Sequence, residues 1–411
     1  MRGRVSLVAS RFTAVVIFAA TICGCSMDAP VPSFPSNSET HPILSRSEQN
    51  PPHPSEISNN SIEQAERAVA TTPRDVEAWT DLGWLLYKNR RFAEAAWVLD
   101  QAKSQQPDDL YVLWLSGLTA YMTGDYAKAK SQLKELWNKD TEVPSGVKMD
   151  ATYDLLGRIY LNEGDLFTAT IFFQHACEIA PNIWQYQFLR GFSQFYRGFY
   201  DDAFGAFSAA RSLNPNEPII SRYSALAKGF RVIVTVHNNQ NDRRFEQSLA
   251  GENPSMAWPK NNEQDLALYA DAISAVNASI AANPGTSELS ASSDIYDLLG
   301  RLYFASGQNG EAITAFQKAI AINAVDADAE FQLAYVLLSE PGDEARASAE
   351  NHLIRSIAIS PNYWLGELRP VTAPHLDLLV NLYLEEGRLS EAQTLAAWER
   401  EHIHPTGGRD D

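Results

Sequence analysis

The chain has 411 residues, and 33 Lys and Arg face 51 Asp and Glu, for a formal net charge of −18 at pH 7. With 45% hydrophobic and 20% charged residues it has the composition of a globular protein, and its length fits two or three domains or one long array. Three cysteines are too few for a dense disulfide framework. Phosphate-backbone binding needs clustered Lys and Arg. The composition therefore argues against a disulfide scaffold, a multi-span membrane protein and a nucleic-acid binder.

Residues 1–24 have the organisation of a signal peptide. Its first part contains Arg2, Arg4 and Arg11, and a mostly apolar segment from Phe12 to Ile22 follows. This run is shorter than the roughly 20 residues that cross a bilayer.

The residues Ile22, Cys23, Gly24 and Cys25 resemble the lipobox of bacterial lipoproteins. The resemblance implies cleavage before Cys25 and acylation of its sulfur, which would anchor the chain to a membrane. Ser26 fits sorting to the outer membrane under the rule known for enteric bacteria. An uncleaved anchor and an ordinary signal peptide are the alternatives.

Residues 25–60 comprise the cysteine to be lipidated and a tether with seven Pro and eight Ser after it. With few large apolar residues, such a segment cannot offset its ordering entropy by burial, so we expect it to be disordered. It would hold the folded part away from the membrane, or else dock in part onto a partner.

A 34-residue period begins at residue 76 and is clearest in the units 76–109, 150–183 and 293–326. Small and large residues recur at fixed positions of these units: Trp79, Leu82, Gly83 and Ala95; Tyr153, Leu156, Gly157, Ala169 and Phe173; Tyr296, Leu299, Gly300, Ala312 and Phe316. The segments 153–160 and 296–303 differ at one position in eight. Three signals predict paired helices. Apolar residues recur at helical spacing, and a glycine in each first helix allows the second helix to come close. Gly164 and Gly307 fall between the two helical segments of their units, where a turn is needed.

This pattern resembles the tetratricopeptide repeat (TPR), W-x2-L-G-x2-Y … G … A-x3-F-x2-A-x4-P. The resemblance implies an all-α solenoid, a right-handed superhelix of about eight helix pairs with a concave groove that binds proteins. We expect an N-terminal array over 61–236, a polar insertion loop over 237–262, a C-terminal array over 263–405 and a disordered tail over 406–411.

Motifs for catalysis or cofactors are missing from the sequence, which has no G-x-S-x-G, H-E-x-x-H or phosphate-binding loop and no paired Cys for zinc. We therefore expect no enzyme activity, cofactor or metal. His402 and His404 are either a weak metal pair or part of a frayed helix end. Cys177 is either a buried thiol or a nucleophile.

The resemblance implies that certain positions of each first helix line the groove. The expected partner-binding residues are Trp84, Tyr87, Tyr111, Trp114, Tyr121, Arg158, Arg301 and Phe304. Trp, Tyr and Arg are common anchors of interfaces. The alternatives are that the aromatic rings pack within the array, and that each Arg forms an ion pair with the Asp four residues before it.

Two irregular segments leave further choices open. In 184–200 either Phe188, Phe192 and Phe195 are core residues or the aromatic side chains form a sticky patch. In 237–262 Phe245 and Trp258 are possible partner contacts, and a disordered loop is the alternative.

The sequence thus predicts a lipid-anchored TPR scaffold on the bacterial outer membrane, facing the periplasm. Its layout is similar to TPR lipoproteins that assist pilus, secretin or polysaccharide-export assembly. The expected partners are envelope proteins or peptides, without nucleic acid, and the negative charge favours basic or neutral ones. A glycan or peptidoglycan binder is the alternative, because Trp84 and Trp114 could stack on sugar rings. The oligomeric state is left open.

Overall fold

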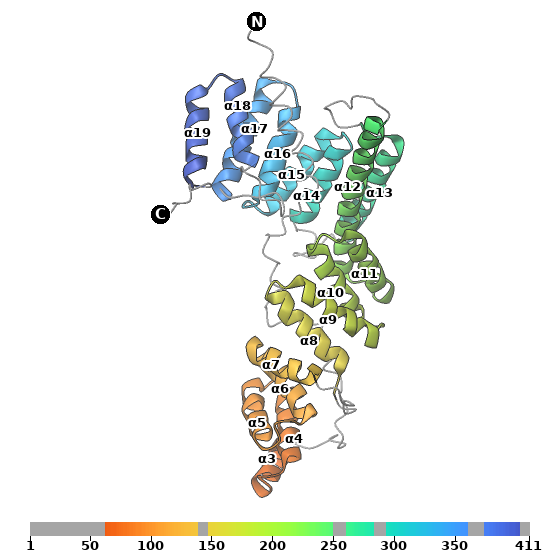
Figure 1. Cartoon of the computed structure of the whole chain (residues 1–411), viewed down its shortest axis with the longest axis vertical. Helices are drawn as coiled ribbons and strands as arrows, with labels where there is room; N and C mark the ends of the chain where they lie inside the picture. Colours follow the sequence, from red (N-terminus) through yellow and green to blue (C-terminus); the bar gives the residue numbers. More distant parts are fainter. Residues whose placement is uncertain (1–61, 139–146, 250–259, 283–292, 361–373, 403–411) are drawn as a thin grey trace. The chain divides into compact units, whose positions relative to one another are not determined.

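The computed structural model describes residues 62–138, 147–249, 260–282, 293–360 and 374–402 (Figure 1). All regular elements in these ranges are α-helices, which confirms the predicted all-α repeat array. None of these helices is both long and apolar enough to span a membrane. The expected signal peptide, Cys25, the tether and the tail over 406–411 lie outside the described residues.

The chain divides into two compact units, each described here by itself. The N-terminal unit ends at Arg197 and also takes in the short segment 212–214. Its helices are α3 (Ile62–Thr71), α4 (Val76–Lys88), α5 (Phe92–Gln105), α6 (Leu110–Met122), α7 (Tyr126–Asn138), α8 (Met149–Asn162), α9 (Leu166–Ile179) and α10 (Trp184–Tyr196).

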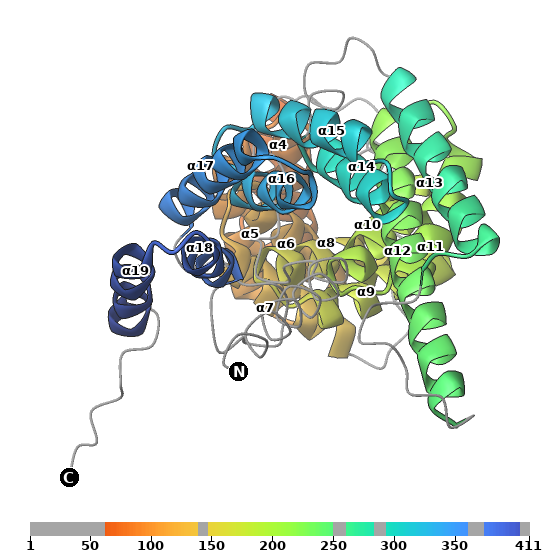
Figure 2. The ribbon, with the colours of Figure 1, turned by 90° about the horizontal axis from the view of Figure 1, so that it is seen from above.

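The C-terminal unit begins at Gly198. Its helices are α11 (Tyr200–Leu213), α12 (Pro218–Leu249), α13 (Glu263–Ala281), α14 (Ser293–Ala305), α15 (Asn309–Ile322), α16 (Ala327–Ser339), α17 (Asp343–Ile359), α18 (Pro374–Glu385) and α19 (Leu389–His402). Figure 2 shows the pairs α14/α15, α16/α17 and α18/α19 side by side, in chain order.

Aspartate side chains start several of the first helices. Asp75 and Asp109 cap α4 and α6, and Asp326 caps α16, each accepting hydrogen bonds from backbone N–H groups of the first turn. These N–H groups have no partner within the helix, so the caps fix where these three helices begin.

Within a pair, the two helices approach closely at a glycine. A Cβ atom on Gly157 would lie 2.6 Å from the Phe173 ring, and one on Gly300 would lie 2.7 Å from the Phe316 ring. Both rings are fully buried. The small residues predicted from the sequence therefore make room for one large side chain of the partner helix.

Turns inside several of the described pairs use a left-handed residue. Gly164 and Gly307 have φ angles of 79° and 86°, as the sequence predicts. Arg90 takes this conformation in the first pair, with a φ of 60°. Glycine adopts it without the steric cost that a Cβ atom adds.

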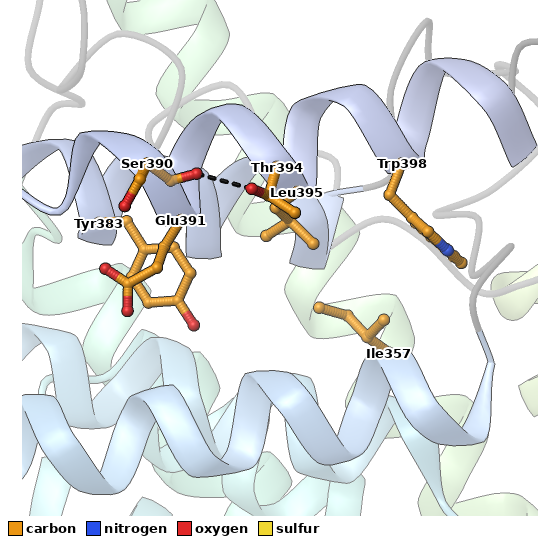
Figure 3. Close-up of a pocket in the computed structure, with 7 residues that line it drawn as sticks. All are labelled: Ile357, Tyr383, Ser390, Glu391, Thr394, Leu395 and Trp398. Carbon is orange, nitrogen blue, oxygen red and sulfur yellow. Dashed lines mark hydrogen bonds between the residues drawn. The ribbon is translucent and has the colours of Figure 1, made fainter.

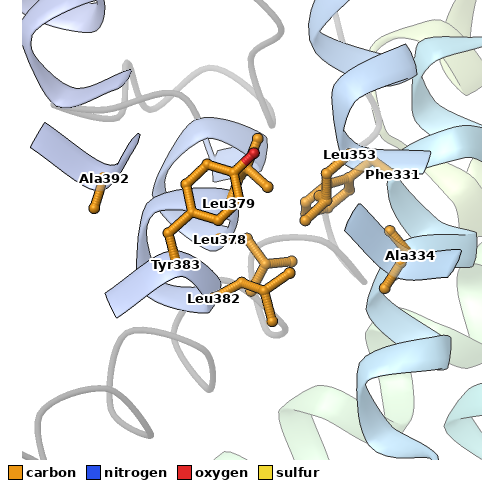
Figure 4. Close-up of a cluster of buried hydrophobic side chains, with 9 residues drawn as sticks. Phe331, Ala334, Leu353, Leu378, Leu379, Leu382, Tyr383 and Ala392 are labelled. Atoms are coloured by element: carbon orange, nitrogen blue, oxygen red, sulfur yellow. The ribbon is translucent and has the colours of Figure 1, made fainter. Parts of the chain in front are cut away.

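The last two described pairs share one apolar core (Figure 4). Phe331 of α16 and Leu353 of α17 lie on one side of this cluster, and Leu379 and Leu382 of α18 lie on the other. Because each pair buries its apolar face against the next, these pairs are held by neighbour contacts rather than by one central core.

The prediction of a loop over 237–262 is wrong for the first half of this range. Helix α12 continues to Leu249, so it also crosses the expected end of the N-terminal array at residue 236. Gln240 Nε2 donates to the side-chain Oδ1 of Asn261 at 2.9 Å, and Arg243 pairs with Asp265 of α13 at 2.6 Å. These polar side chains stabilise a helix because Asn261, just before α13, and Asp265, in its first turn, supply their partners. The division between the units lies near residue 198 instead.

The aromatic residues of α10 are core residues. Phe188, Phe192 and Phe195 are buried, as one of the two sequence interpretations holds. Gln185 and Gln187 are buried as well, so α10 is enclosed on more than one side.

We expect Gly157→Ala to destabilise the N-terminal unit by about 1–3 kcal/mol, because its methyl group would overlap the Phe173 ring. Urea unfolding followed by circular dichroism measures the effect. Gly205 of α11 is the matched control, since nothing lies within 4 Å of its Cβ position. Gly205→Ala should instead stabilise by about 0.5–1 kcal/mol. Equal effects of the two changes would show that the close approach is not a constraint.

Candidate functional site

The aromatic residues expected to line an open groove are mostly buried. Trp84 and Tyr87 of α4 are each 4% exposed, and Trp114 of α6 is 1% exposed. The Trp84 and Tyr87 rings stack with centroids 5.8 Å apart, and Tyr111 lies 5.6 Å from Trp114. The expectation of an exposed aromatic surface is therefore wrong for these four residues, because the rings pack within the array.

Two other expected residues are only half-buried. Tyr121 lies 5.3 Å from Tyr126 between ring centroids, and Phe304 meets Tyr335 edge to face at 5.8 Å. Burial raises the pKa of Tyr121 to about 12, so its phenol is neutral at physiological pH.

Arg158 forms a buried ion pair on α8. Its Nε donates to both carboxylate oxygens of Asp154 at 2.9 Å, and both side chains are nearly inaccessible. Tyr186 of α10 donates to the Asp150 carboxylate of α8 at 3.1 Å. The sequence alternative of an Asp–Arg pair is confirmed, but the pair lies inside the array rather than on its surface.

Arg301 occupies the same repeat position on α14 and has two acidic partners. Its Nε donates to Asp297 at 2.6 Å, and its Nη2 pairs with Asp328 of α16. In the first turn of α14, Asp294 pairs with Arg222 of α12 at 2.5 Å.

The carboxylates near Arg301 outnumber it. Burial, and then the charges of Asp328 and Asp326, raise the pKa of Asp297 from 3.8 to about 8, although Arg301 opposes this shift. Burial also raises the pKa of Asp326. Taking a carboxylate out of water beside two others makes protonation favourable.

Several buried polar atoms on α6, α8 and α10 have no hydrogen-bond partner in the described part of the chain. Three of them are Nε1 of Trp114, Nη2 of Arg158 and Oε1 of Gln185. Buried polar groups in native proteins are nearly always hydrogen-bonded, and an unmade bond costs about 1–3 kcal/mol. These atoms lie on three successive first helices and are buried. We call them the unpaired polar row.

A hollow lies between α17, α18 and α19 (Figure 3). This cavity of about 500 Å³ is lined by Ile357, Tyr383, Ser390, Glu391, Thr394, Leu395 and Trp398. Its lining is largely apolar, and the sequence pattern, which is degenerate in the last unit, did not point to it. Leu395 and Trp398 three residues apart on one helix face are the signal that could have found it.

The remaining expected sites divide between described and undescribed residues. Phe245 lies in the helical part of α12, and Trp258 lies outside the described residues. Cys177 is buried, and burial raises the pKa of its thiol to about 11, so the interpretation as an inert thiol holds. The described residues contain no group of three or more His, Cys, Asp or Glu able to hold a metal ion.

Family comparisons agree with this architecture. Models described as tetratricopeptide repeat match residues 59–109, 80–136 and 151–183, and one described as TPR repeat matches residues 300–339. The chain is a tetratricopeptide repeat protein. Its matched segments fall on helix pairs of both units, including the two that carry the Asp–Arg pairs.

Individual relatives are distant. Superkiller protein 3 of Schizosaccharomyces pombe is 25% identical over 126 residues, which is 30% of this chain and only 9% of that protein. YrrB, described as a TPR protein with an unusual peptide-binding site, is 14% identical, covering 66% of this chain and 97% of its own with a TM-score of 0.36. The C-terminal part of a TPR protein of Cytophaga hutchinsonii is 15% identical, with coverages of 69% and 96% and a TM-score of 0.44.

We expect the Asp297 carboxyl to make stability depend on pH. Its pKa is higher in the folded chain than its ordinary value, so its contribution to stability is full below about pH 4 and is lost as the pH rises through about 8. Between these pH values the free energy of unfolding falls by about 1.4 kcal/mol per pH unit for one proton.

Asp297→Asn removes this proton, so the free energy of unfolding should fall less between pH 5 and pH 8 than in the wild type. Urea unfolding at both pH values measures it. Asp271→Asn, at a largely exposed carboxylate on α13, is the control and should keep the wild-type slope. An unchanged slope in Asp297→Asn would contradict the assignment.

Proposed function

We propose that this protein is a non-catalytic scaffold that binds segments of other proteins in the bacterial cell envelope. It would be lipid-anchored through Cys25, on the outer membrane facing the periplasm, and would assist the assembly or stability of an envelope complex such as a pilus, secretin or export machine. The anchor and the location are supported by the lipobox-like residues 22–25 and the Pro/Ser-rich segment that follows.

The observation that carries the binding role is the unpaired polar row of Trp114, Arg158 and Gln185. It lies on first helices of a TPR array, the helices that the family resemblance associates with peptide binding. A protein segment offers backbone carbonyl and N–H groups at regular spacing, which is the chemistry that a row of donors and acceptors accepts.

Burial of the rings counts against the glycan alternative, and it also means that a protein segment reaches the unpaired polar row only when the side chains around it move. Stacking on a sugar requires an accessible ring face, whereas Trp84 and Trp114 are 4% and 1% exposed. We expect purified protein to show no turnover.

In-cell crosslinking followed by mass spectrometry tests the scaffold role. Trp114→Phe keeps a six-membered ring and removes the indole N–H, whose loss breaks no hydrogen bond in the free protein. We expect a defined envelope complex to form with the wild type and to fall at least fivefold with Trp114→Phe.

Trp137→Phe is the control with the same substitution, because Trp137 on α7 is 43% exposed and is not one of the residues of this row. It should keep the complex. Melting curves of both variants check that they are folded. An undiminished complex in folded Trp114→Phe, or crosslinks only to nonspecific neighbours, would contradict the proposal.

The anchor has its own test. Metabolic labelling with an alkyne fatty acid should label the wild type and Cys177→Ala, and should fail in Cys25→Ala, which should also leave the membrane fraction. Cys177 is the control because its thiol is buried in the folded chain. If the Cys25→Ala variant keeps the label, Cys25 is not the site of fatty-acid attachment.

A further inference from the structure

The chain contains the same ion-pair motif twice, once in each unit. Residues 153–160 of α8 and 296–303 of α14 both place an Asp four residues before an Arg. In each copy the Arg Nε donates to that Asp, at 2.9 Å for Arg158 and 2.6 Å for Arg301. Both arginines are buried, at 6% and 4% exposed.

The two copies differ in what meets the far end of the guanidinium. Twenty-seven residues after Arg301, Asp328 lies in the first turn of α16 and accepts from the Arg301 Nη2. Twenty-seven residues after Arg158, the corresponding position in the first turn of α10 is Gln185. The α14–α16 copy thus shows what an arginine in this motif binds when a carboxylate is available.

In the α8–α10 copy this second interaction is not made. Nη2 of Arg158 and Oε1 of Gln185 are both buried, and neither has a hydrogen-bond partner in the part of the chain that the structure describes. The Tyr186 side chain, next to Gln185, donates to the Asp150 carboxylate of α8 at 3.1 Å.

We propose that Nη2 of Arg158 binds an acidic side chain, Asp or Glu, of the protein segment that the N-terminal unit recognises. This inference rests on the proposed function and names the chemistry of one position in it. The incoming carboxylate would take the place that Asp328 holds beside Arg301.

The charges at this position allow such a ligand. One added carboxyl group beside Asp154 and Arg158 reproduces the composition of the Arg301, Asp297 and Asp328 group, and burial raises the pKa of Asp154 as it raises that of Asp297. A guanidinium also offers separate N–H donors to two carboxylates. The first turn of α10 adds backbone N–H groups, whose dipoles favour negative charge.

Entry of the ligand requires the Gln185 side chain to move, since the Arg158 Nη2 is buried. The Gln185 oxygen accepts no hydrogen bond in the described chain, so its displacement breaks none there. A carboxylate makes a charge-assisted bond in exchange.

The test uses the full chain labelled with ¹⁵N and the probe peptides Ac-Gly-Asp-Gly-NH2 and Ac-Gly-Asn-Gly-NH2. The Arg158 Nε–H signal, assigned by its loss in Arg158→Lys, should shift with the Asp peptide at millimolar concentration. The Asn peptide should bind at least tenfold more weakly. Equal responses to the two peptides would overturn the proposal.

Two reciprocal variants sharpen the test. Gln185→Asp supplies the carboxylate within the chain. It should therefore raise the melting temperature and lower the affinity for the Asp peptide at least tenfold. Asp328→Gln gives the Arg301 group the composition of the Arg158 group, so the Arg301 signal should gain a response to the Asp peptide. Circular dichroism confirms that both variants are folded. An unchanged affinity in folded Gln185→Asp would overturn the proposal.

Failure of this inference is distinguishable from failure of the proposed function. If the crosslinked complex is sensitive to Trp114→Phe but not to Gln185→Asp, the scaffold role stands and the acidic ligand is wrong. If the Asp peptide binds as expected but no protein complex forms, the carboxylate site stands and the scaffold role is wrong.

Discussion

The close approach of the two helices in each pair is the contact on which the rest of this array depends. Gly83, Gly117, Gly157 and Gly300 each face a Leu or Phe of the partner helix at a separation that leaves no room for a Cβ atom. Because the helices are held this near, residues at equal repeat positions fall into equivalent places along the chain. That equivalence is why two distant segments, 153–160 and 296–303, build the same buried ion pair.

Equivalent places need not carry equivalent charge. Around Arg301 the carboxylates are in excess, and the pKa of Asp297 is raised accordingly. Around Arg158 the single pair with Asp154 is balanced and one donor is left over. The net charge of −18 acts at long range and favours basic or neutral partners, whereas a buried guanidinium acts only on what touches it. An acidic residue at one position of a bound segment is therefore compatible with the overall charge of the chain.

Much of the helical architecture could be predicted because its signals are local. Gly164 and Gly307 occupy turns that require a positive φ, and Phe188 and Phe192 are large apolar residues at helical spacing. The error at 237–249 has a different origin. Asn and Gln there read as a loop, and only the partners Asn261 and Asp265 near α13 explain why they are helical. The aromatic positions failed for a related reason, since a repeat position specifies a face but not whether a neighbouring ring covers it.

By itself the sequence determined the repeat period, the helix pairs and the identity of the Asp–Arg motif, because each depends on residues close together in the chain. The tertiary structure decided which of those residues are accessible. It buried Trp84, Trp114 and Arg158, and it gave Arg301 a second carboxylate that Arg158 lacks. Burial and charge balance are sums over residues from several helices, and the packing of those helices sets them.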